Sequence, residues 1–539
     1  MTPADISAKP AYPGIIDYVQ PDGSTIQIIL QGDENYHQTL TPDGTPLQRN
    51  AEGFLVPVPE SARKNAPRRK EQKKYLFSGS AFPAEGSPRA LVVLAEFVDK
   101  KFSMSNPKDF YNRLINEEGF SDYGANGSAR DFFVSNSKKK FSPQFDVYGP
   151  VALPQSMSYY GENDMWQYDV HPELVCIEAC RQLDTEVDFS IYDSDGDGLI
   201  DNVFIYYAGY GEADSGLEDT IWPHSADLRD FELGMDYAFD GVILNRYAMS
   251  NEIDYQYKRP DGVGTFIHEF SHVLGLPDLY NTTFQASYTP GEYSTLDYGP
   301  YNNKGLTPPY YSIYERYSLG WLTPKRITES GYYTLAPIHA GNEGFIIPTE
   351  KEDEFFLIEN RQQRVWDKYI PGHGMIIWHI DFDQDIWDKN IVNNTASHQY
   401  VDLVEADGKA GGATKDADTF PGTGGITSIS FETTPALRSW GKKQLEVLAI
   451  EEIKEGFKDS LTFYARVNPN SGVDNIGADG TGAYSVSGRQ VSNESDSEAI
   501  VADITGSVVA QVAPGATVAL EPGLYIVYGK EGSVKAMIR

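Results

Sequence analysis

The chain has 539 residues, enough for three to four domains at about 150 residues each, and its 44 Lys and Arg against 78 Asp and Glu give a formal net charge of −34. So acidic a chain is a poor candidate for binding nucleic acids or anionic membranes, which need a positive footprint. Its hydrophobic content of 40% argues against a disordered acidic chain, and its two cysteines exclude a disulfide scaffold.

The chain encodes no membrane span, because it holds no run of 18 or more apolar residues. It begins Met1-Thr2-Pro3, without the charged and apolar segments of a signal peptide, so the protein is either cytosolic or has lost its signal peptide. Cys176 and Cys180 lie four residues apart in a helix-like stretch. That spacing favours two reduced core thiols over a disulfide.

Residues 1–62 have the pattern of short strands and turns, with a β-branched strand expected at 25–30. A basic linker is predicted next, at residues 63–87, and its segment 63–74 holds seven basic residues and one acidic residue. Exposed segments of this kind are cut readily by trypsin-like proteases. A partner protease that cuts there would make residues 1–62 a removable pro-segment.

The region 88–330 mixes strands and helices, as expected of an α+β catalytic domain. Continuous apolar residues predict buried strands at 89–97 and 200–208. Periodicity and end signals predict helices at 109–116, 128–135, 172–183, 263–274 and 309–319.

After residue 331 the pattern is mostly that of strands. The region 331–467 is predicted to be β-rich and to pack on the catalytic domain, with strands at 344–348, 355–360, 374–380, 445–450 and 460–467. Residues 468–490, rich in Gly, Asn, Ser and Asp, predict a linker. Residues 491–539 alternate short strands with turns and predict a small β-sandwich.

The strongest chemical signal is the motif HEFSH at 268–272. Residues four apart on a helix face the same way, so His268 and His272 can present two imidazoles to one Zn²⁺. Glu269 can then take a proton from a zinc-bound water. A catalytic zinc needs a third protein ligand, and Asp278, which follows a glycine-containing turn, is the first carboxylate able to return to the metal.

Other interpretations of these positions remain open. HExxH also occurs by chance in helices whose two histidines are satisfied in the core. Carboxylates often cap turns, so the third ligand is open as well, and Glu292 is the reserve candidate. Three acidic residues of the pro-segment could supply a carboxylate to the zinc in a latent form: Asp22, Asp33 and Glu34.

The stretch HEFSHVLGLPDLY (268–280) resembles the active-site motif of the immune inhibitor A-like secreted zinc metallopeptidases, metzincin-type enzymes with Asp in place of the third histidine. Three further stretches are similar to this family in order and spacing: TPPYYSIYERYSLGWL (307–322), EFFLIENRQQRVWD (354–367) and PGHGMIIWHID (371–381). The start of the chain resembles the family's pro-segment in QPDGS (20–24), GDENYH (32–37) and TPDGTPL (41–47). The resemblance spans residues 10–465 and implies a metzincin-like fold, a zymogen and structural calcium.

One stretch departs from the family's pattern. Metzincins carry a methionine turn beneath the zinc, and the corresponding stretch here is YSTLDYG (293–299), with Leu296 where methionine is expected. Leucine nearly conserves the volume of methionine, so we expect it to be tolerated. Tyr298 is placed like the tyrosine that some metzincins swing toward the metal, and its hydroxyl could stabilise the tetrahedral oxyanion. The alternative is a tyrosine buried in the core.

A second ion site is predicted in the sequence DSDGDGLID (193–201). Carboxylates occupy positions 1, 3, 5 and 9 of an EF-hand-type loop: Asp193, Asp195, Asp197 and Asp201. Phe204 stands where that loop needs its last glutamate, so this is not an EF-hand, but Leu199 could offer its carbonyl to a Ca²⁺. Crowded carboxylates repel one another without a cation, which favours calcium over a solvated acidic turn.

The last residues, 501–539, resemble the C-terminal sorting or surface-attachment β-domains of secreted Bacteroidota proteins. A stabilising accessory β-module is the alternative. Either interpretation favours export, so we expect a secreted or cell-surface protein whose signal peptide has been removed.

The sequence thus predicts a monomeric zinc metalloendopeptidase that hydrolyses peptide bonds of extracellular proteins and is made as a zymogen. A catalytically silent surface binding protein with the same fold is the second hypothesis. The intact Glu269 argues against that hypothesis, whereas Leu296 leaves it open. A peptidase-fold enzyme that acts on another amide substrate is the third.

Overall fold

The computed structural model describes residues 6–34, 36–59, 82–164, 168–231, 233–283, 288–468, 484–487, 489–503, 507–521, 523–530 and 532–538. The chain divides into two compact units, Met1–Arg466 and Val467–Arg539. The basic segment 63–74 and most of the predicted linker 468–490 lie outside the described residues, so both remain predictions. No helix in the described part of the chain is long and apolar enough to cross a membrane.

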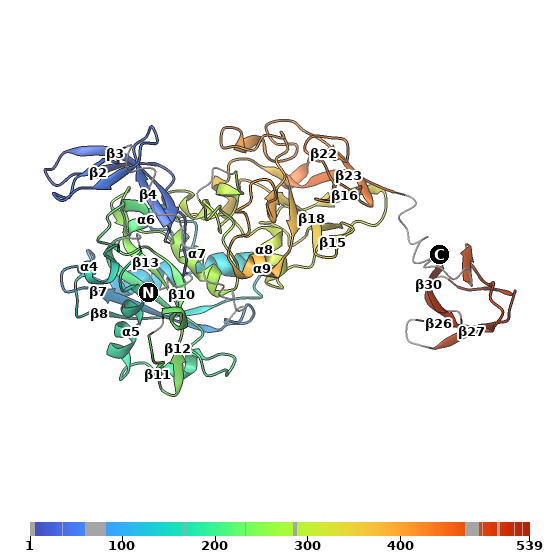
Figure 1. The fold of residues 1–539 in the computed structure, drawn as a ribbon, viewed down its shortest axis with the longest axis horizontal. Coiled ribbons are helices and arrows are strands. Elements are labelled where there is room, and N and C mark those ends of the chain that lie inside the picture. The colour runs from blue at the N-terminus through green and yellow to red at the C-terminus, as the bar shows by residue number, and fades with distance from the viewer. Residues whose placement is uncertain are drawn as a thin grey trace. The chain divides into compact units, whose positions relative to one another are not determined.

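The first unit is built around a mixed sheet with the strand order β1-β10-β13-β9-β7-β8, in which β14 also pairs with β13 (Figure 1). Its strands are β1 (Ile6–Ser7), β7 (Arg89–Glu96), β8 (Gln144–Ala152), β9 (Val203–Tyr210), β10 (Ser225–Asp227), β13 (Arg246–Asp254) and β14 (Arg259–Pro260). The strands β8, β7, β9 and β13 are parallel, whereas β10 is antiparallel to β13. The N-terminal strand β1 pairs with β10 in turn.

Helices cover both faces of this sheet. The α-helices described in the first unit are α2 (Pro107–Asn116), α3 (Ala129–Asn136), α4 (Met157–Gly161), α5 (Pro172–Leu183), α6 (Glu212–Ser215), α7 (Val263–Val273), α8 (Ile313–Ser318) and α9 (Gln384–Asp388). Alternate residues of β7 enter two separate cores, one shared with α2, α3 and α7 and the other with α5. This double burial explains the unbroken apolar sequence of β7. Cys176 and Cys180 are free thiols buried in the α5 core.

Most predicted elements match observed ones to within a few residues, but the helix predicted at 309–319 is too long. The structure has only α8 there, because Ser312 begins the helix as its N-cap and Glu315 completes a capping box. Two prolines, Pro308 and Pro309, precede this cap. A proline restricts the residue before it to extended conformations, which prevents an earlier start.

The N-terminal part forms a three-stranded sheet and a hairpin of its own. These strands are β2 (Ile15–Val19), β3 (Thr25–Asp33), β4 (Tyr36–Leu40), β5 (Leu47–Arg49) and β6 (Leu55–Pro57). Figure 1 shows β2, β3 and β4 beside α6. The N-terminal part and the residues around α6 share one apolar cluster. Its members are Ala8, Ala11, Ile16, Tyr18, Ile28, Leu30, Leu55, Ala213, Trp222 and Tyr255. Residues of the predicted pro-segment are therefore packed against later residues of the same unit.

The β-rich region after residue 324 holds two sheets. The first has the order β15 (Lys325–Arg326), β17 (Phe345–Pro348), β18 (Glu354–Arg361), β19 (Gly374–Asp381) and β20 (Val401–Leu403). The second has the order β16 (Gly331–Leu335), β23 (Leu461–Val467), β22 (Val447–Glu455) and β21 (Ile429–Ser430). Apolar residues of β18 and β19 belong to the same core as α7.

The second unit contains two sheets around a small core. One has the order β24 (Tyr484–Ser487), β25 (Gln490–Asn493) and β28 (Thr517–Ala519). The other has the order β27 (Val508–Val512), β26 (Ala499–Asp503), β29 (Gly523–Gly529) and β30 (Gly532–Ile538). Both sheets contribute buried residues to this core, which includes Val491, Val501 and Val527.

Candidate active site

The helix α7 carries the HEFSH motif in a tightly packed position. Every residue of the helix is buried. A Cβ atom at Gly262 or Gly264 would lie 2.0 Å from the carbonyl oxygen of Gly305 or 2.2 Å from that of Pro300, so the start of the helix needs glycine to approach this backbone. Gly275 then turns the chain with a φ of +88°, in the left-handed region that favours glycine. That turn brings Asp278 back over the helix.

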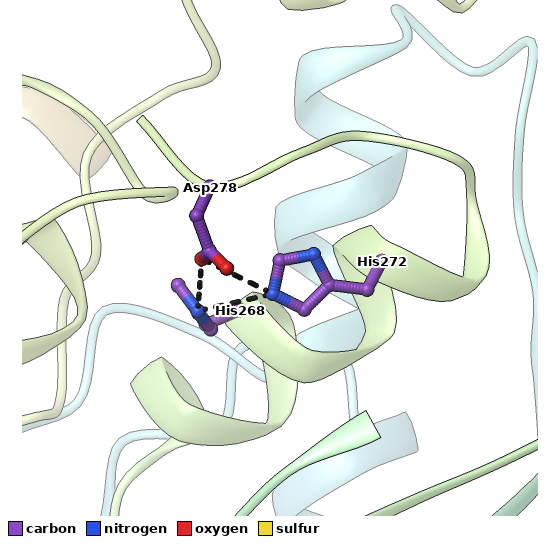
Figure 2. A group of neighbouring side chains, drawn as sticks. All are labelled: His268, His272 and Asp278. Carbon is purple, nitrogen blue, oxygen red and sulfur yellow. Dashed lines mark hydrogen bonds and ion pairs between the residues drawn. The ribbon is translucent and has the colours of Figure 1, made fainter. Parts of the chain in front are cut away.

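The side chains of His268, His272 and Asp278 converge on one point, as Figure 2 shows. The Nε2 atoms of the two histidines are 3.2 Å apart. Asp278 Oδ1 lies 3.2 Å from Nε2 of His268 and 3.3 Å from Nε2 of His272. All three residues are buried, and these potential ligand atoms could hold one metal ion.

The other nitrogen of each imidazole fixes how these rings can be protonated. Nδ1 of His268 lies 2.8 Å from the carbonyl oxygen of Thr295, and Nδ1 of His272 lies 2.8 Å from that of Leu276. A carbonyl oxygen only accepts hydrogen bonds, so each Nδ1 carries a proton, and neutral rings point the lone pairs of both Nε2 atoms at the carboxylate. Three electron-rich atoms that are buried together repel one another, and a bound cation would attract all three.

Asp278 is held as a metal ligand would be. Its Oδ2 accepts a hydrogen bond of 2.6 Å from Nδ2 of Asn390, and its backbone N–H donates one of 2.7 Å to Oδ1 of the same residue. Its other oxygen, Oδ1, accepts no hydrogen bond within the described residues. The donor set therefore fits Zn²⁺, with Asn390 orienting the carboxylate.

Glu269 lies beside this group with one free carboxylate oxygen. Its Oε1 accepts a 3.0 Å hydrogen bond from the backbone N–H of Lys9. Its Oε2 is buried and has no hydrogen-bond partner in the described part of the chain. Burial raises the pKa of Glu269 to about 7. A carboxylate with such a pKa can both accept and return a proton near neutral pH.

The stretch predicted to replace the methionine turn lies beneath the histidines. The carbonyl oxygen of Thr295 accepts the hydrogen bond from Nδ1 of His268, and the carbonyl oxygen of Leu296 accepts a 2.8 Å hydrogen bond from the Leu279 N–H. The side chain of Leu296 is completely buried in the core. Tyr298 is half-buried, and burial, followed by the charge of Asp297, raises its pKa. The turn thus connects the first histidine to the segment that carries Asp278.

Tyr280, two residues after Asp278, is a candidate site residue that the sequence did not single out. Its hydroxyl donates a 2.6 Å hydrogen bond to the carbonyl oxygen of Ala8. The side chain is buried, and its pKa is raised by burial and then by the charge of Asp278. The only sequence signal would have been its position within the same motif, at the end of HEFSHVLGLPDLY.

Glu292, the reserve ligand, is engaged elsewhere. Its carboxylate pairs with the ammonium group of Lys415, and it is not among the residues that converge with the two histidines. The structure therefore favours Asp278 as the third ligand.

Acidic residues of the N-terminal part differ in where they lie. Asp22 is exposed and accepts hydrogen bonds from Ser24 in its own turn. Asp33 and Glu34 are buried instead. Burial raises the pKa of Glu34, and the charges of Asp33 and Asp278 raise it further.

The predicted calcium loop has a different character. Asp193, Asp195 and Asp197 lie within reach of one ion, and Asp195 and Asp197 are exposed. Backbone amides of the loop already donate hydrogen bonds to these carboxylates. Asp193 Oδ1 accepts a 2.8 Å hydrogen bond from the Gly196 N–H, and Asp197 Oδ1 accepts one of 2.8 Å from the Leu199 N–H. Asp201 is buried outside this group, accepts from the Ser194 N–H at 3.1 Å, and has a pKa raised by burial to about 6.

Comparisons with known proteins agree with this geometry. Residues 87–306 match the family model of the immune inhibitor A peptidase M6 catalytic domain. The chain is 28% identical over 244 residues to the pre-pro-metalloprotease PrtV of Vibrio cholerae serotype O1 (strain M66-2), covering 40% of this chain and 26% of that protein. It is 27% identical over 266 residues to immune inhibitor A of Bacillus thuringiensis subsp. alesti, covering 42% of this chain and 38% of that protein.

The matched part spans less than two fifths of the length of either relative. Residues 87–306 hold every strand of the main sheet except β1, together with the helix α7 and all three converging side chains. The comparisons therefore support a metallopeptidase catalytic domain of the immune inhibitor A type in this part of the chain.

Proposed function

We propose that this protein is a zinc metalloendopeptidase with a metzincin-like catalytic domain, which is made as a zymogen and acts on proteins outside the cell. The observation that carries the proposal is the buried convergence of two imidazole Nε2 atoms and one carboxylate oxygen beside a glutamate. Two histidines and one carboxylate are a known ligand set of catalytic zinc, and they leave positions open for substrate.

Zn²⁺ bound by His268, His272 and Asp278 would supply a Lewis acid that polarises the peptide carbonyl and acidifies a water molecule. Glu269 takes the proton of the attacking water and delivers it to the nitrogen of the leaving amine. Its buried environment keeps the carboxyl near a pKa of about 7, so it can carry out both transfers. Asn390 and the carbonyls of Thr295 and Leu276 hold the three ligands in place.

The variant Glu269→Gln tests the catalytic proposal. After the activating cut within 63–74, it should keep one zinc per chain and the folded structure, yet hydrolyse casein about 10³-fold more slowly than the wild-type chain cut in the same way, within the range for removal of a general base. Zinc is measured by inductively coupled plasma mass spectrometry and folding by circular dichroism. Cleavage at the wild-type rate would exclude this role, and a silent binding protein would show zinc but no cleavage in either chain.

The zymogen proposal is supported by the N-terminal contacts with the site. The backbone N–H of Lys9 donates a hydrogen bond to the carboxylate of Glu269, and the hydroxyl of Tyr280 donates one to the carbonyl oxygen of Ala8. His37 stacks on Trp222 and pairs with Glu212 at 2.9 Å, which anchors the same segment on the catalytic domain. We propose that these residues, with Asp33 and Glu34, exclude substrate until the chain is cut within 63–74.

Latency is measured as casein hydrolysis before and after a cut at 63–74. For this, a recognition site for an unrelated, sequence-specific protease replaces part of that segment. Activity should appear only after the cut. Equal activity in the intact chain would contradict a latent form.

Two subsidiary proposals concern the rest of the chain. We propose that the loop 193–201 binds a structural Ca²⁺ through Asp193, Asp195 and Asp197, with Leu199 and Asp201 completing the site. We also propose that the second unit serves in secretion or surface attachment, as the resemblance of residues 501–539 implies. Calcium has its test below, and the second unit's role is tested by whether deletion of residues 491–539 leaves the protein inside the cell.

A further inference from the structure

The first residues of the chain follow the path of a peptide through the active site. In β1, Ile6 pairs with Ala226 and Ser7 with Ser225, antiparallel to β10. Without β1, β10 would be the edge of the main sheet. Addition of an extended peptide to such an edge is a common way of binding substrates through their main chain. The N-terminal segment therefore shows how a substrate backbone can lie.

The peptide bond between Ala8 and Lys9 has both of its polar atoms held by the site. Tyr280 donates to the carbonyl oxygen of Ala8 at 2.6 Å, and Glu269 accepts from the amide nitrogen of Lys9 at 3.0 Å. In the proposed reaction Glu269 returns a proton to the leaving nitrogen. The nitrogen of Lys9 thus marks the leaving side of the cleaved bond, and Ala8 marks the acyl side.

The side chain of Lys9 enters a buried pocket, which we call the acidic pocket and define by Asp214, Asp254, Asp261, Thr265 and Tyr301. Lys9 is 3% exposed, and its ammonium donates to Thr265 Oγ1 at 2.8 Å and lies 5.1 Å from the centre of the Tyr301 ring. Thr265 in turn donates to Asp261 Oδ2 at 2.7 Å.

Two of the three carboxylates in the acidic pocket respond to the lysine charge. Burial raises the pKa of Asp214 to about 8, although Lys9 lowers it, and Lys9 also opposes the rise caused by burial at Asp254. Asp214 is 4% exposed, and its Oδ1 has no hydrogen-bond partner among the described residues. A buried acceptor without a partner is costly, and a cationic side chain that reaches this oxygen would lower that cost.

We propose that the acidic pocket is the specificity pocket for the first residue on the leaving side of the cleaved bond, and that it selects lysine or arginine. The inference rests on the proposed peptidase function. In the reaction, water adds its oxygen to the carbonyl carbon, the C–N bond breaks, and Glu269 passes the proton to the nitrogen of the basic residue. The products are a carboxylate and a fragment that begins with lysine or arginine.

An apolar residue in the acidic pocket would leave the buried carboxylates without a cation, and an acidic residue would add a like charge. Both are ways in which a site rejects the wrong ligand. An arginine side chain also suits the pocket, because its guanidinium can bond to carboxylates and stack on Tyr301. Thr265 lies three residues before His268 on α7, so the pocket is attached directly to the helix that carries the ligands.

The test uses the chain activated at an engineered site within 63–74, freed of its N-terminal fragment and incubated with a library of peptides. Mass spectrometry reads both sides of each new cut, and the Glu269→Gln chain, treated in the same way, gives the background. We expect lysine and arginine to be enriched at least about 10-fold at the start of new fragments, the discrimination expected of one charged contact. Abundant cleavage without this enrichment would overturn the inference.

Two matched substitutions connect the preference to the pocket. Asp214→Asn should lower kcat/KM about 10-fold for a peptide with lysine after the cleaved bond, while the rate for the same peptide with uncharged norleucine changes little. Glu218→Gln removes the same charge four residues later, outside the pocket, and should change neither rate. A Asp214→Asn chain that slows both peptides equally would show a merely structural role.

A binding measurement separates this inference from the peptidase proposal. Fluorescence anisotropy of the labelled peptide Ile-Ser-Ala-Lys-Pro-Ala-Tyr, which copies residues 6–12, is followed on the activated Glu269→Gln chain. We expect binding that is lost when glutamate replaces the lysine. If no peptide is cut by the wild-type chain but this difference persists, the peptidase function fails and the pocket assignment stands. Equal binding of both peptides would overturn the assignment.

Discussion

The two described clusters of potential metal ligands differ in burial and in the hydrogen bonds that their carboxylate oxygens accept. In the loop 193–201, exposed carboxylates accept hydrogen bonds from the backbone amides of their own turn. Around His268, three buried atoms point at one another, and Asp278 Oδ1 accepts no hydrogen bond from any described residue. Burial without a partner is therefore the stronger sign of a metal site, because the exposed loop is already satisfied by its own backbone and by water.

The largest expected effect comes from removing a ligand of the buried group. His272→Ala should reduce bound zinc from about one per chain to under a tenth and lower peptidase activity by about 10³-fold or more, since loss of the metal removes the Lewis acid. Metal content and casein hydrolysis measure this, with Asp195→Asn as the control that keeps both. If His272→Ala kept zinc and activity, the contrast between the two clusters would fail.

A smaller effect should distinguish two tyrosines near that group. Tyr280→Phe removes the hydroxyl that holds the Ala8 carbonyl, so kcat should fall about 10²-fold, as for loss of one oxyanion donor. Tyr298→Phe should change kcat less than about 3-fold, because the hydroxyl that holds the Ala8 carbonyl belongs to Tyr280. Steady-state kinetics on one peptide compares them. The reverse order would restore Tyr298 as the residue that stabilises the oxyanion.

The smallest effect is expected in the exposed loop. Calcium at 1 mM should raise the thermal midpoint of the wild-type chain by about 2–4 °C, because a ligand that binds only the folded state stabilises it. Asp195→Asn should abolish this rise and leave the midpoint in chelator unchanged. Differential scanning fluorimetry measures both midpoints. An unchanged midpoint of the wild-type chain in calcium would contradict an ion site in this loop.

The sequence was sufficient to predict the parts of the site whose residues lie close together in the chain. Two histidines four apart on one helix, and Asp278 six residues later across a glycine turn, are brought together by local geometry. Strands such as β7, β9 and β18 were predictable because an apolar run can be buried only in a few ways.

What sequence could not supply are contacts between distant segments. Lys9 meets Thr265 across 256 residues and Glu269 across 260. Nothing near Lys9 distinguishes it from an exposed lysine, and nothing near Asp214 distinguishes it from a surface carboxylate. For the same reason Asp22 could not be separated from Asp33 and Glu34, although only the last two are buried.

The apolar cluster shared by the N-terminal sheet and the catalytic unit has a kinetic consequence. In the intact chain the covalent connection keeps the segment at an effective concentration on the order of millimolar. After the cut, the same surfaces remain complementary, and rebinding depends on how dilute the fragment has become. Activation should therefore begin with a lag, which shortens on dilution and returns when the purified fragment is added back.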